Sequence, residues 1–309
     1  MMLRGQTLQN RYQIIKILGS GGFGDTYKAI DNKLPGNPWC VVKHLSPKDT
    51  SPKILSIAKK LFEREAKCLQ KLGKQHEQIP TLYAYFCERE EFYLVQEYIE
   101  GNPLNEEFTP GKKWSETDVI AFLQDTLQVL NFVHQKQVIH RDLKPSNLIR
   151  RACDGKIVLI DFGAVKQLTT QATDFPGKIP LTVAVGTPEY MPCEQKMGYP
   201  RLCSDIYALG ITAIEALTGV APGNFPINQD MEIIWRNQAP QVSDELATVL
   251  DEMVRYHCRD RYQNASEVLQ NLPILEKQTI HKESQPKSKN KNLFQNNFDG
   301  LDVTIPIGA

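Results

Sequence analysis

The apolar positions along the chain first follow the pattern of strands and then that of a helix. Residues 12–18 and 39–45 are short runs rich in β-branched side chains and bounded by turn residues, which is typical of strands. Over 54–72, apolar residues recur at spacings of three and four, which predicts an amphipathic helix with Gly73 as its C-cap. Residues 92–99 return to a strand pattern.

The pattern becomes mainly helical after a junction near residues 97–103. Ser115, followed three residues later by Asp118, is a variant of the capping box and predicts the start of a long helix. Two further helical patterns lie near 205–219 and 243–256. The chain therefore divides into a front part rich in strands and a rear part rich in helices.

Composition limits the kinds of partner and compartment. Lysine plus arginine equals aspartate plus glutamate, 36 each, so the net charge gives no general attraction to nucleic acid or to an anionic membrane. Seven cysteines without a Cys-x-x-Cys pair argue against a disulfide framework or a zinc knuckle and favour a reducing cytoplasm. The start lacks a signal-peptide core, and no apolar run of about 18 residues predicts a membrane span.

A glycine-rich segment follows the first predicted strand. It has the spacing G-x-G-x-x-G and consists of Gly19, Ser20, Gly21, Gly22, Phe23 and Gly24. Glycines let a backbone approach phosphates closely, but the motif alone also fits a dinucleotide-binding turn or a flexible hairpin. A dinucleotide fold needs a helix after the last glycine. Residues 25–30 read as a strand instead, which favours a hairpin.

Residues 140–147 carry the strongest chemical signal. Asp142 and Asn147 lie five residues apart and can face one site from a short loop. The triplet Asp161-Phe-Gly163 follows a buried-strand pattern at 156–160. Any one of these acids could be a loop cap. Together they supply what phosphoryl transfer requires, namely a base near a hydroxyl and ligands for a metal ion.

With these motifs the chain resembles the eukaryotic-type serine/threonine protein kinases over about residues 12–272. Residues 19–28 and 92–101 are most similar to cyanobacterial members of that family. The resemblance implies an α+β, bilobal protein kinase fold. Its N-terminal lobe, 12–97, would hold a five-stranded antiparallel sheet and one helix, and its C-terminal lobe, 98–272, would be mainly helical. Residues 275–309 are polar and are expected to form a disordered tail.

The resemblance also implies catalytic roles. Lys43 would pair with the α- and β-phosphates of ATP, and Glu65 would hold Lys43, with Glu63 as the nearby rival. Asp142 would accept or orient the proton of the substrate hydroxyl. Lys144 would steady the γ-phosphate. In this arrangement the residues act on charge that develops on the transferred phosphate.

Nucleotide and metal binding are implied in the same way. Asn147 and Asp161 would ligate Mg²⁺, which prefers oxygen ligands. The adenine would lie against the segment 97–99. The positions that would bind ATP are Gly19, Ser20, Gly21, Gly22, Phe23, Gly24, Thr26, Val41, Lys43, Gln96, Glu97, Ile99, Asn147, Ile149 and Asp161.

Other matches to the family are architectural. Residues 186–194 resemble the end of an activation segment, Glu194 would pair with Arg261, and Asp205 would brace the catalytic loop. An apolar spine would consist of Leu69, Leu82, His140 and Phe162. The chain departs from the family pattern at Thr26 (usually valine), Val41 (usually alanine) and Cys193 (usually proline), and Gln96 would be the gatekeeper beside the adenine.

The expected function is ATP- and Mg²⁺-dependent phosphorylation of serine and threonine on protein substrates, in signalling, with autophosphorylation. Lys144 and Thr187 favour serine and threonine over tyrosine. One alternative is a pseudokinase scaffold that binds nucleotide or partners without catalysis, and another is a small-molecule kinase of similar fold. A regulatory partner protein or a transient dimer would supply the input.

A phosphorylated threonine is expected to control activity through Arg141, which precedes the proposed base. A buried arginine needs an anionic partner, and a phosphothreonine can pair with it bidentately. Thr182 is favoured because of its position before Gly186. The other candidates are Thr169, Thr170 and Thr173, and the alternative is that these threonines only solvate a loop.

Overall fold

The computed structural model describes residues 4–21, 24–47, 51–109, 111–162, 166–167 and 186–274. All of these lie within the unit 1–275. Several predictions lie outside the described residues: those on Gly22, Phe23, Gly163, Thr169, Thr170, Thr173, Thr182 and the tail 275–309.

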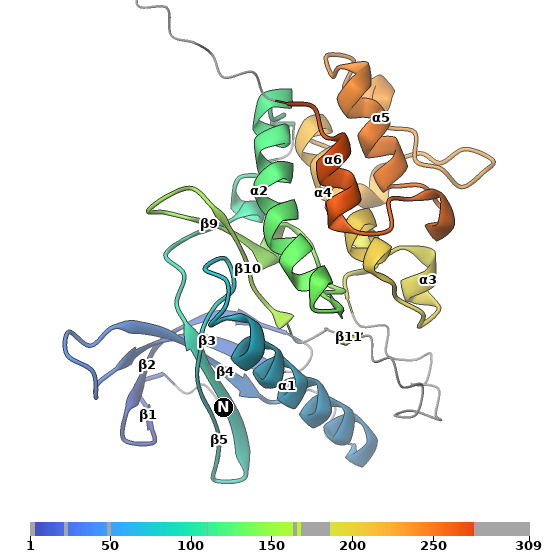
Figure 1. The fold of residues 1–309 in the computed structure, drawn as a ribbon. Coiled ribbons are helices and arrows are strands. Elements are labelled where there is room, and N and C mark those ends of the chain that lie inside the picture. Colours follow the sequence, from blue (N-terminus) through green and yellow to red (C-terminus); the bar gives the residue numbers. More distant parts are fainter. Residues whose placement is uncertain are drawn as a thin grey trace, which may run out of the picture. The chain divides into compact units, whose positions relative to one another are not determined.

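The N-terminal part is an antiparallel sheet with one long helix (Figure 1). The strand order is β1-β2-β3-β4-β6-β5. The bounds are β1 Thr7–Leu8, β2 Tyr12–Ser20, β3 Gly24–Asp31, β4 Trp39–Leu45, β5 Leu82–Glu88 and β6 Glu91–Glu97. In the described part of the chain the sheet thus has one strand more than expected. The extra strand, β1, pairs Leu8 with Tyr12 and is too short to show a period in the sequence.

Helix α1 (Pro52–Leu72) contacts β4 and β5 with the apolar stripe that its sequence predicts. Its buried residues include Ala58, Phe62, Ala66 and Leu69. The helix ends at Gly73, as predicted, but Gly73 keeps a right-handed φ of −64°. The need for glycine comes from a close approach: a Cβ atom there would lie 2.2 Å from the carbonyl oxygen of Pro80.

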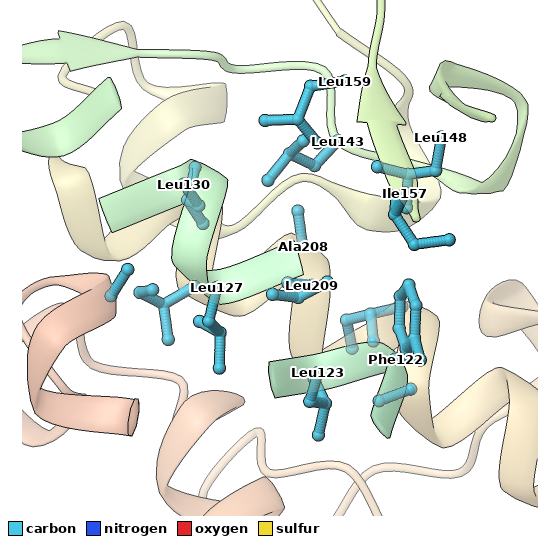
Figure 2. Packing of buried hydrophobic residues seen from close by; sticks show 14 of the residues in the cluster. Phe122, Leu123, Leu127, Leu130, Leu143, Leu148, Ile157, Leu159, Ala208 and Leu209 are labelled. Atoms are coloured by element: carbon cyan, nitrogen blue, oxygen red, sulfur yellow. The ribbon is translucent and has the colours of Figure 1, made fainter. Parts of the chain in front are cut away.

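The C-terminal part is mainly helical. Its helices are α2 (Glu116–Gln135), α3 (Cys193–Lys196), α4 (Leu202–Thr218), α5 (Asp244–Met253) and α6 (Ala265–Asn271). Helix α2 contacts α4 and α6, and α4 contacts α5. Ser115 caps α2 as predicted, because its Oγ atom accepts a hydrogen bond from the Asp118 backbone N–H at 3.1 Å. Figure 2 shows the apolar core, where Leu123 and Leu127 of α2 lie near Leu209 of α4.

Short strands carry the loops that matter for chemistry. These strands are β7 (Gly101–Pro103), β8 (Val138–Ile139), β9 (Leu148–Arg151), β10 (Ile157–Leu159) and β11 (Lys166–Gln167). Strand β9 lies between β10 and β7, and β11 pairs with β8. Residues 140–147 therefore connect β8 to β9, and Asp161 follows β10. Packing of β10 against α2 fixes both loops on the helical core.

Candidate active site

Residues 140–147 are held by a carboxylate from α4. Asp205 is 1% exposed and accepts hydrogen bonds from the backbone N–H groups of His140 and Arg141, both at 2.8 Å. Arg141 has a φ of 73°, which is costly for a residue with a side chain. Two strong hydrogen bonds to a buried charge hold this strained turn in place. The expected brace by Asp205 is confirmed.

Asp142 lies at the centre of a small network. The Asn147 Nδ2 atom donates to its backbone oxygen at 2.8 Å and to its Oδ2 atom at 2.9 Å. Lys144 Nζ lies 3.2 Å from Asp142 Oδ2 and donates to Thr187 Oγ1 at 2.7 Å. The Thr187 hydroxyl donates in turn to Asp142 Oδ1 at 2.9 Å. The structure therefore joins Thr187 to the loop 140–147.

A second charged cluster lies where α1 meets the sheet. Lys43 of β4 forms an ion pair with Glu65 of α1, and its Nζ atom lies 3.1 Å from Asp161 Oδ1. Glu63, the rival of Glu65, is exposed and pairs with Lys67 on its own helix at 2.6 Å. The predicted helix register is confirmed, since Glu65 and not Glu63 contacts Lys43.

Burial and mutual charge shift the pKa values in this cluster. Burial and the nearby Asp161 raise the pKa of Glu65, although Lys43 acts in the opposite direction. The positive charge of Lys43 lowers the pKa of Asp161. Burial alone would lower the pKa of Lys43, but the carboxylates of Asp161 and Glu65 outweigh it and raise the value. At neutral pH Lys43 is therefore a fixed positive charge.

A cavity of about 1040 Å³ joins the two clusters. Every proposed site residue that the structure describes lines this cavity. They are Gly19, Ser20, Gly21, Gly24, Thr26, Val41, Lys43, Glu65, Gln96, Glu97, Ile99, Asp142, Lys144, Asn147, Ile149 and Asp161. Residues from strands, helices and loops thus converge on one space of the size that binds small molecules.

Strands β2 and β3 on either side of the glycine-rich segment pair antiparallel, as the hairpin prediction required. The Gly21 N–H donates to the Gly24 oxygen at 2.8 Å. Gly24 has a φ of 155°, and a Cβ atom there would lie 1.9 Å from the backbone oxygen of His44. A residue with a side chain at position 24 would therefore strike the backbone of β4. A hydrogen bond from Ser20 lowers the pKa of Asp25.

Part of the cavity wall was not predicted from the sequence. Leu18 lines it directly before the first glycine, and Ala58, Leu61 and Phe62 of α1 line it beside Glu65. An apolar residue next to the glycine motif was a usable signal for Leu18. The α1 residues were recognised only as core, because the sequence does not say which part of a buried helix face borders a cavity. The hydrogen bonds of Thr187 with Asp142 and Lys144 also could not be predicted without the fold.

Two contacts expected from the architecture are present. Arg261 pairs with Glu194 through two hydrogen bonds, at 2.6 Å and 3.0 Å. The rings of His140 and Phe162 lie 4.8 Å apart between centroids, and both residues are completely buried. These contacts fix residues 140–147 and 186–194 on the helical core.

A second cavity, of about 550 Å³, lies beside α2 and β10. Two of its charged wall residues are paired within the protein: Arg150 binds Glu107, and Asp125 accepts hydrogen bonds from Gln78 and from the backbone of Ile157. This cavity contains none of the motif residues. The chemistry of the chain therefore belongs to the larger cavity.

Comparisons with known proteins agree with this geometry. The chain is 47% identical over 266 residues to serine/threonine-protein kinase C of Synechocystis sp., which covers 86% of this chain and 50% of the relative. It is 45% identical over 270 residues to serine/threonine-protein kinase PknA of Nostoc sp., with 87% and 48% covered. The chain spans about half the length of these curated relatives.

The fold matches solved structures as well. The kinase domain of PknI from Mycobacterium tuberculosis aligns with a TM-score of 0.65 and 21% identity, over 88% of this chain and 98% of that one. Among the described residues, no helix is both long and apolar enough to cross a membrane. The family model described as protein kinase domain matches residues 12–272. With this match and these relatives, the chain belongs to the protein kinase family.

Proposed function

We propose that this chain transfers the γ-phosphate of ATP to serine and threonine hydroxyls of protein substrates, with Mg²⁺ as the metal. The observation that carries the proposal is the convergence of two clusters on one cavity: Asp142 with Lys144 at one side, and Lys43 with Asp161 at the other. The first cluster would supply a base and a cation, and the second would supply a cation and a carboxylate that binds metal. Phosphoryl transfer needs these groups together.

The cavity suits a nucleotide. Gly19, Gly21 and Gly24 line it, and glycines let a backbone approach phosphates closely. Lys43 supplies a positive charge in the same cavity. At the opposite end, Gln96, Glu97 and Ile99 offer a mixed apolar and polar wall for a base. ATP therefore fits the residues present: residues 96–99 would hold its base, and Lys43 and the flanking glycines would hold its phosphates.

Asn147 and Asp161 would hold the metal. The Nδ2 atom of Asn147 is committed to Asp142, which leaves Oδ1, an oxygen ligand, for a cation. The Asp161 carboxylate is nearly half exposed and borders the cavity. Two oxygen donors with room for water and phosphate oxygens suit Mg²⁺. When bound, the metal would neutralise charge on the phosphates.

The chain's own residues would then position the acceptor and its proton. Asp142 would orient the substrate hydroxyl and take its proton, because its carboxylate faces the cavity from a braced loop. Lys144 would stabilise negative charge on the transferred group. Glu65 would hold Lys43 in place. Thr187, hydrogen-bonded to both Asp142 and Lys144, would keep the base and the cation at a fixed separation.

The acceptor class rests on similarity. The curated relatives are named serine/threonine-protein kinases, and Lys144 with Thr187 fits that preference.

We also propose the boundaries 12–97 and 98–272 for the two lobes, with 275–309 as a tail. The seven cysteines are all free, which supports a reducing compartment such as the cytoplasm. We also propose that a regulatory partner protein or a transient dimer supplies the input that controls this chain.

Control by phosphorylation is a further part of this proposal. The Nε atom of Arg141 is buried without a partner among the described residues, and burial lowers the pKa of this guanidinium. A phosphothreonine at Thr182, which lies outside the described residues, would supply an anion. Mass spectrometry after incubation with ATP should find phosphate at 182, and Thr182→Ala should be less active. Full activity without phosphate anywhere between 161 and 194 would end this part of the proposal.

Phosphate incorporation tests the function directly. Purified protein should label a generic protein acceptor from Mg²⁺-ATP, with phosphate on serine and threonine. Choline and simple sugars offered as acceptors should remain unlabelled. Nucleotide binding without any transfer would favour the pseudokinase scaffold, and labelling of a small molecule alone would favour the small-molecule kinase.

A further inference from the structure

The amine of Lys28 lies between two aromatic rings close to the base end of the cavity. Its Nζ atom is 4.1 Å from the centroid of the Trp39 ring and 3.9 Å from that of the Tyr98 ring. Both distances are well inside the range of about 6 Å over which an ammonium group is attracted to a ring face. One cation thus joins β3, β4 and the segment that follows β6.

Strand register places this contact on the cavity side of the sheet. Side chains alternate between the two faces of a strand, so Trp39 shares a face of β4 with Val41 and Lys43, which line the cavity. On β3, Lys28 pairs with Val41 and is two residues from Thr26, another cavity residue. Lys28 itself does not line the cavity, so it can act on a ligand only through its neighbours.

Tyr98 is the neighbour that matters. It lies in the connection between β6 and β7, where the chain passes from the sheet to the helical part. Glu97, Tyr98 and Ile99 all line the cavity at the end assigned to the base. Lys28 therefore ties this connection to the face of the sheet that covers the same end of the cavity.

We propose that Lys28 is a positioning residue that fixes the segment 97–99 for nucleotide binding. Its cation, held between Trp39 and Tyr98, preorganises the base end of the cavity without touching the nucleotide. This inference rests on the proposed function, because that function places the base there. A preorganised site binds more tightly, since less of the chain must be ordered on binding.

Replacement of Lys28 tests the role. Lys28→Met keeps the aliphatic stem and removes the charge, and we expect it to weaken ADP binding about 3- to 10-fold by isothermal titration calorimetry. The KM for ATP should rise by a similar factor, with kcat within about 2-fold, because the reacting groups are unchanged. Lys28→Arg keeps a cation between the rings and should stay within about 2-fold of the wild type in both measurements.

Lys59→Met is the matched control. The Nζ atom of Lys59 lies 4.7 Å from the ring centroid of Phe92, so this variant removes the same kind of contact far along the sheet from residues 97–99. It should change ADP affinity by less than about 2-fold, even where thermal stability falls. Tyr98→Leu alone should weaken ADP binding, and Lys28→Met added to it should cost little more, because both variants break the same contact.

Three results would overturn the inference: ADP affinity unchanged in Lys28→Met, equal weakening in Lys28→Arg, or equal weakening in Lys59→Met. None of these would affect the proposed function. That function fails separately, if the wild-type protein neither binds ADP nor transfers phosphate.

Discussion

Glu65 and Glu194 are two buried carboxylates, each paired with a cation, yet their pKa values shift in opposite directions. They are 4% and 5% exposed. The pKa of Glu65 is raised, by burial and by the nearby Asp161. Burial alone would also raise the pKa of Glu194, but hydrogen bonds from Arg261 and Ser204 outweigh it and lower the value. Two glutamates at similar burial therefore differ in the direction in which their pKa values shift.

The number of donors explains the difference. Arg261 is bidentate on Glu194, and the Ser204 hydroxyl adds a third hydrogen bond at 2.8 Å. Such pairs are strong and geometrically fixed. Glu65 has one ammonium partner, Lys43, which it shares with Asp161. The Glu194 pair is thus held by three hydrogen bonds, whereas Glu65 relies on one ammonium group that it shares with Asp161.

The largest expected effect on activity lies in the cluster of Lys43, Glu65 and Asp161. Asp161→Asn removes a charge from the Lys43 cluster and a proposed metal ligand, so phosphate transfer should fall by about three orders of magnitude or more. The melting temperature should change little, because Asp161 is nearly half exposed. Transfer assays with Mg²⁺-ATP and a thermal melt check both parts. Near-normal turnover in the variant would refute the role of Asp161.

For the pair of Glu194 with Arg261, the expected effect is on stability. Glu194→Gln leaves the Arg261 guanidinium buried and poorly paired, which should cost about 3–5 kcal/mol. The melting temperature should fall by about 6–15 °C by calorimetry. Asp154→Asn is the control, since it breaks an exposed pair with Arg151 and should shift the melting temperature by less than about 2 °C. Equal shifts in the two variants would mean that Glu194 is not the stronger element.

A matched pair of variants on α1 separates function from stability. Glu65→Gln should lower activity about 10- to 100-fold, because Lys43 loses the partner that orients it. Its melting temperature should stay near that of the wild type, since a carboxyl with a raised pKa gains little from ionisation in the fold. Glu63→Gln, four residues from Lys67 on the exposed face, should keep activity within about 2-fold. The reverse pattern would mean that α1 is in another register.

Acid pH should produce the smallest effect. Because the folded-state pKa of Glu194 is lowered, its stabilising contribution is complete above the unfolded value of about 4.3 and is lost as pH falls through the folded value. The difference in melting temperature between the wild type and Glu194→Gln should be constant from pH 7 to about 5 and shrink below that. A difference that already shrinks near pH 6 would contradict the lowered pKa.

Much of the site could be predicted because its residues lie in short motifs. Asp142, Lys144 and Asn147 share one loop, so their proximity follows from the sequence spacing, and Lys43 faces the cavity because β4 was correctly assigned. Glu65 could be chosen over Glu63 only through the family resemblance, and the structure bears that choice out.

The rest of the site could not be predicted, because it depends on contacts between segments that are distant in the sequence. Thr187 reaches Asp142 across 45 residues, and no local pattern predicts such a hydrogen bond. The place of Lys28 between Trp39 and Tyr98 follows from the register of β3 against β4 and from the course of the chain after β6, which apolar periodicity does not determine. Gly73 was predicted as a helix end, but the close approach of Pro80 that requires glycine there was invisible in the sequence.

Single-turnover phosphate transfer in Asp142→Asn tests the central claim most directly. This variant keeps the shape of the side chain and removes the carboxylate that Lys144, Asn147 and Thr187 surround. We expect transfer from ATP to a serine- or threonine-containing protein to fall by about 10³-fold or more, with ADP affinity within about 3-fold of the wild type. Transfer at the wild-type rate in this variant would contradict the assignment of the cavity as a phosphotransferase site.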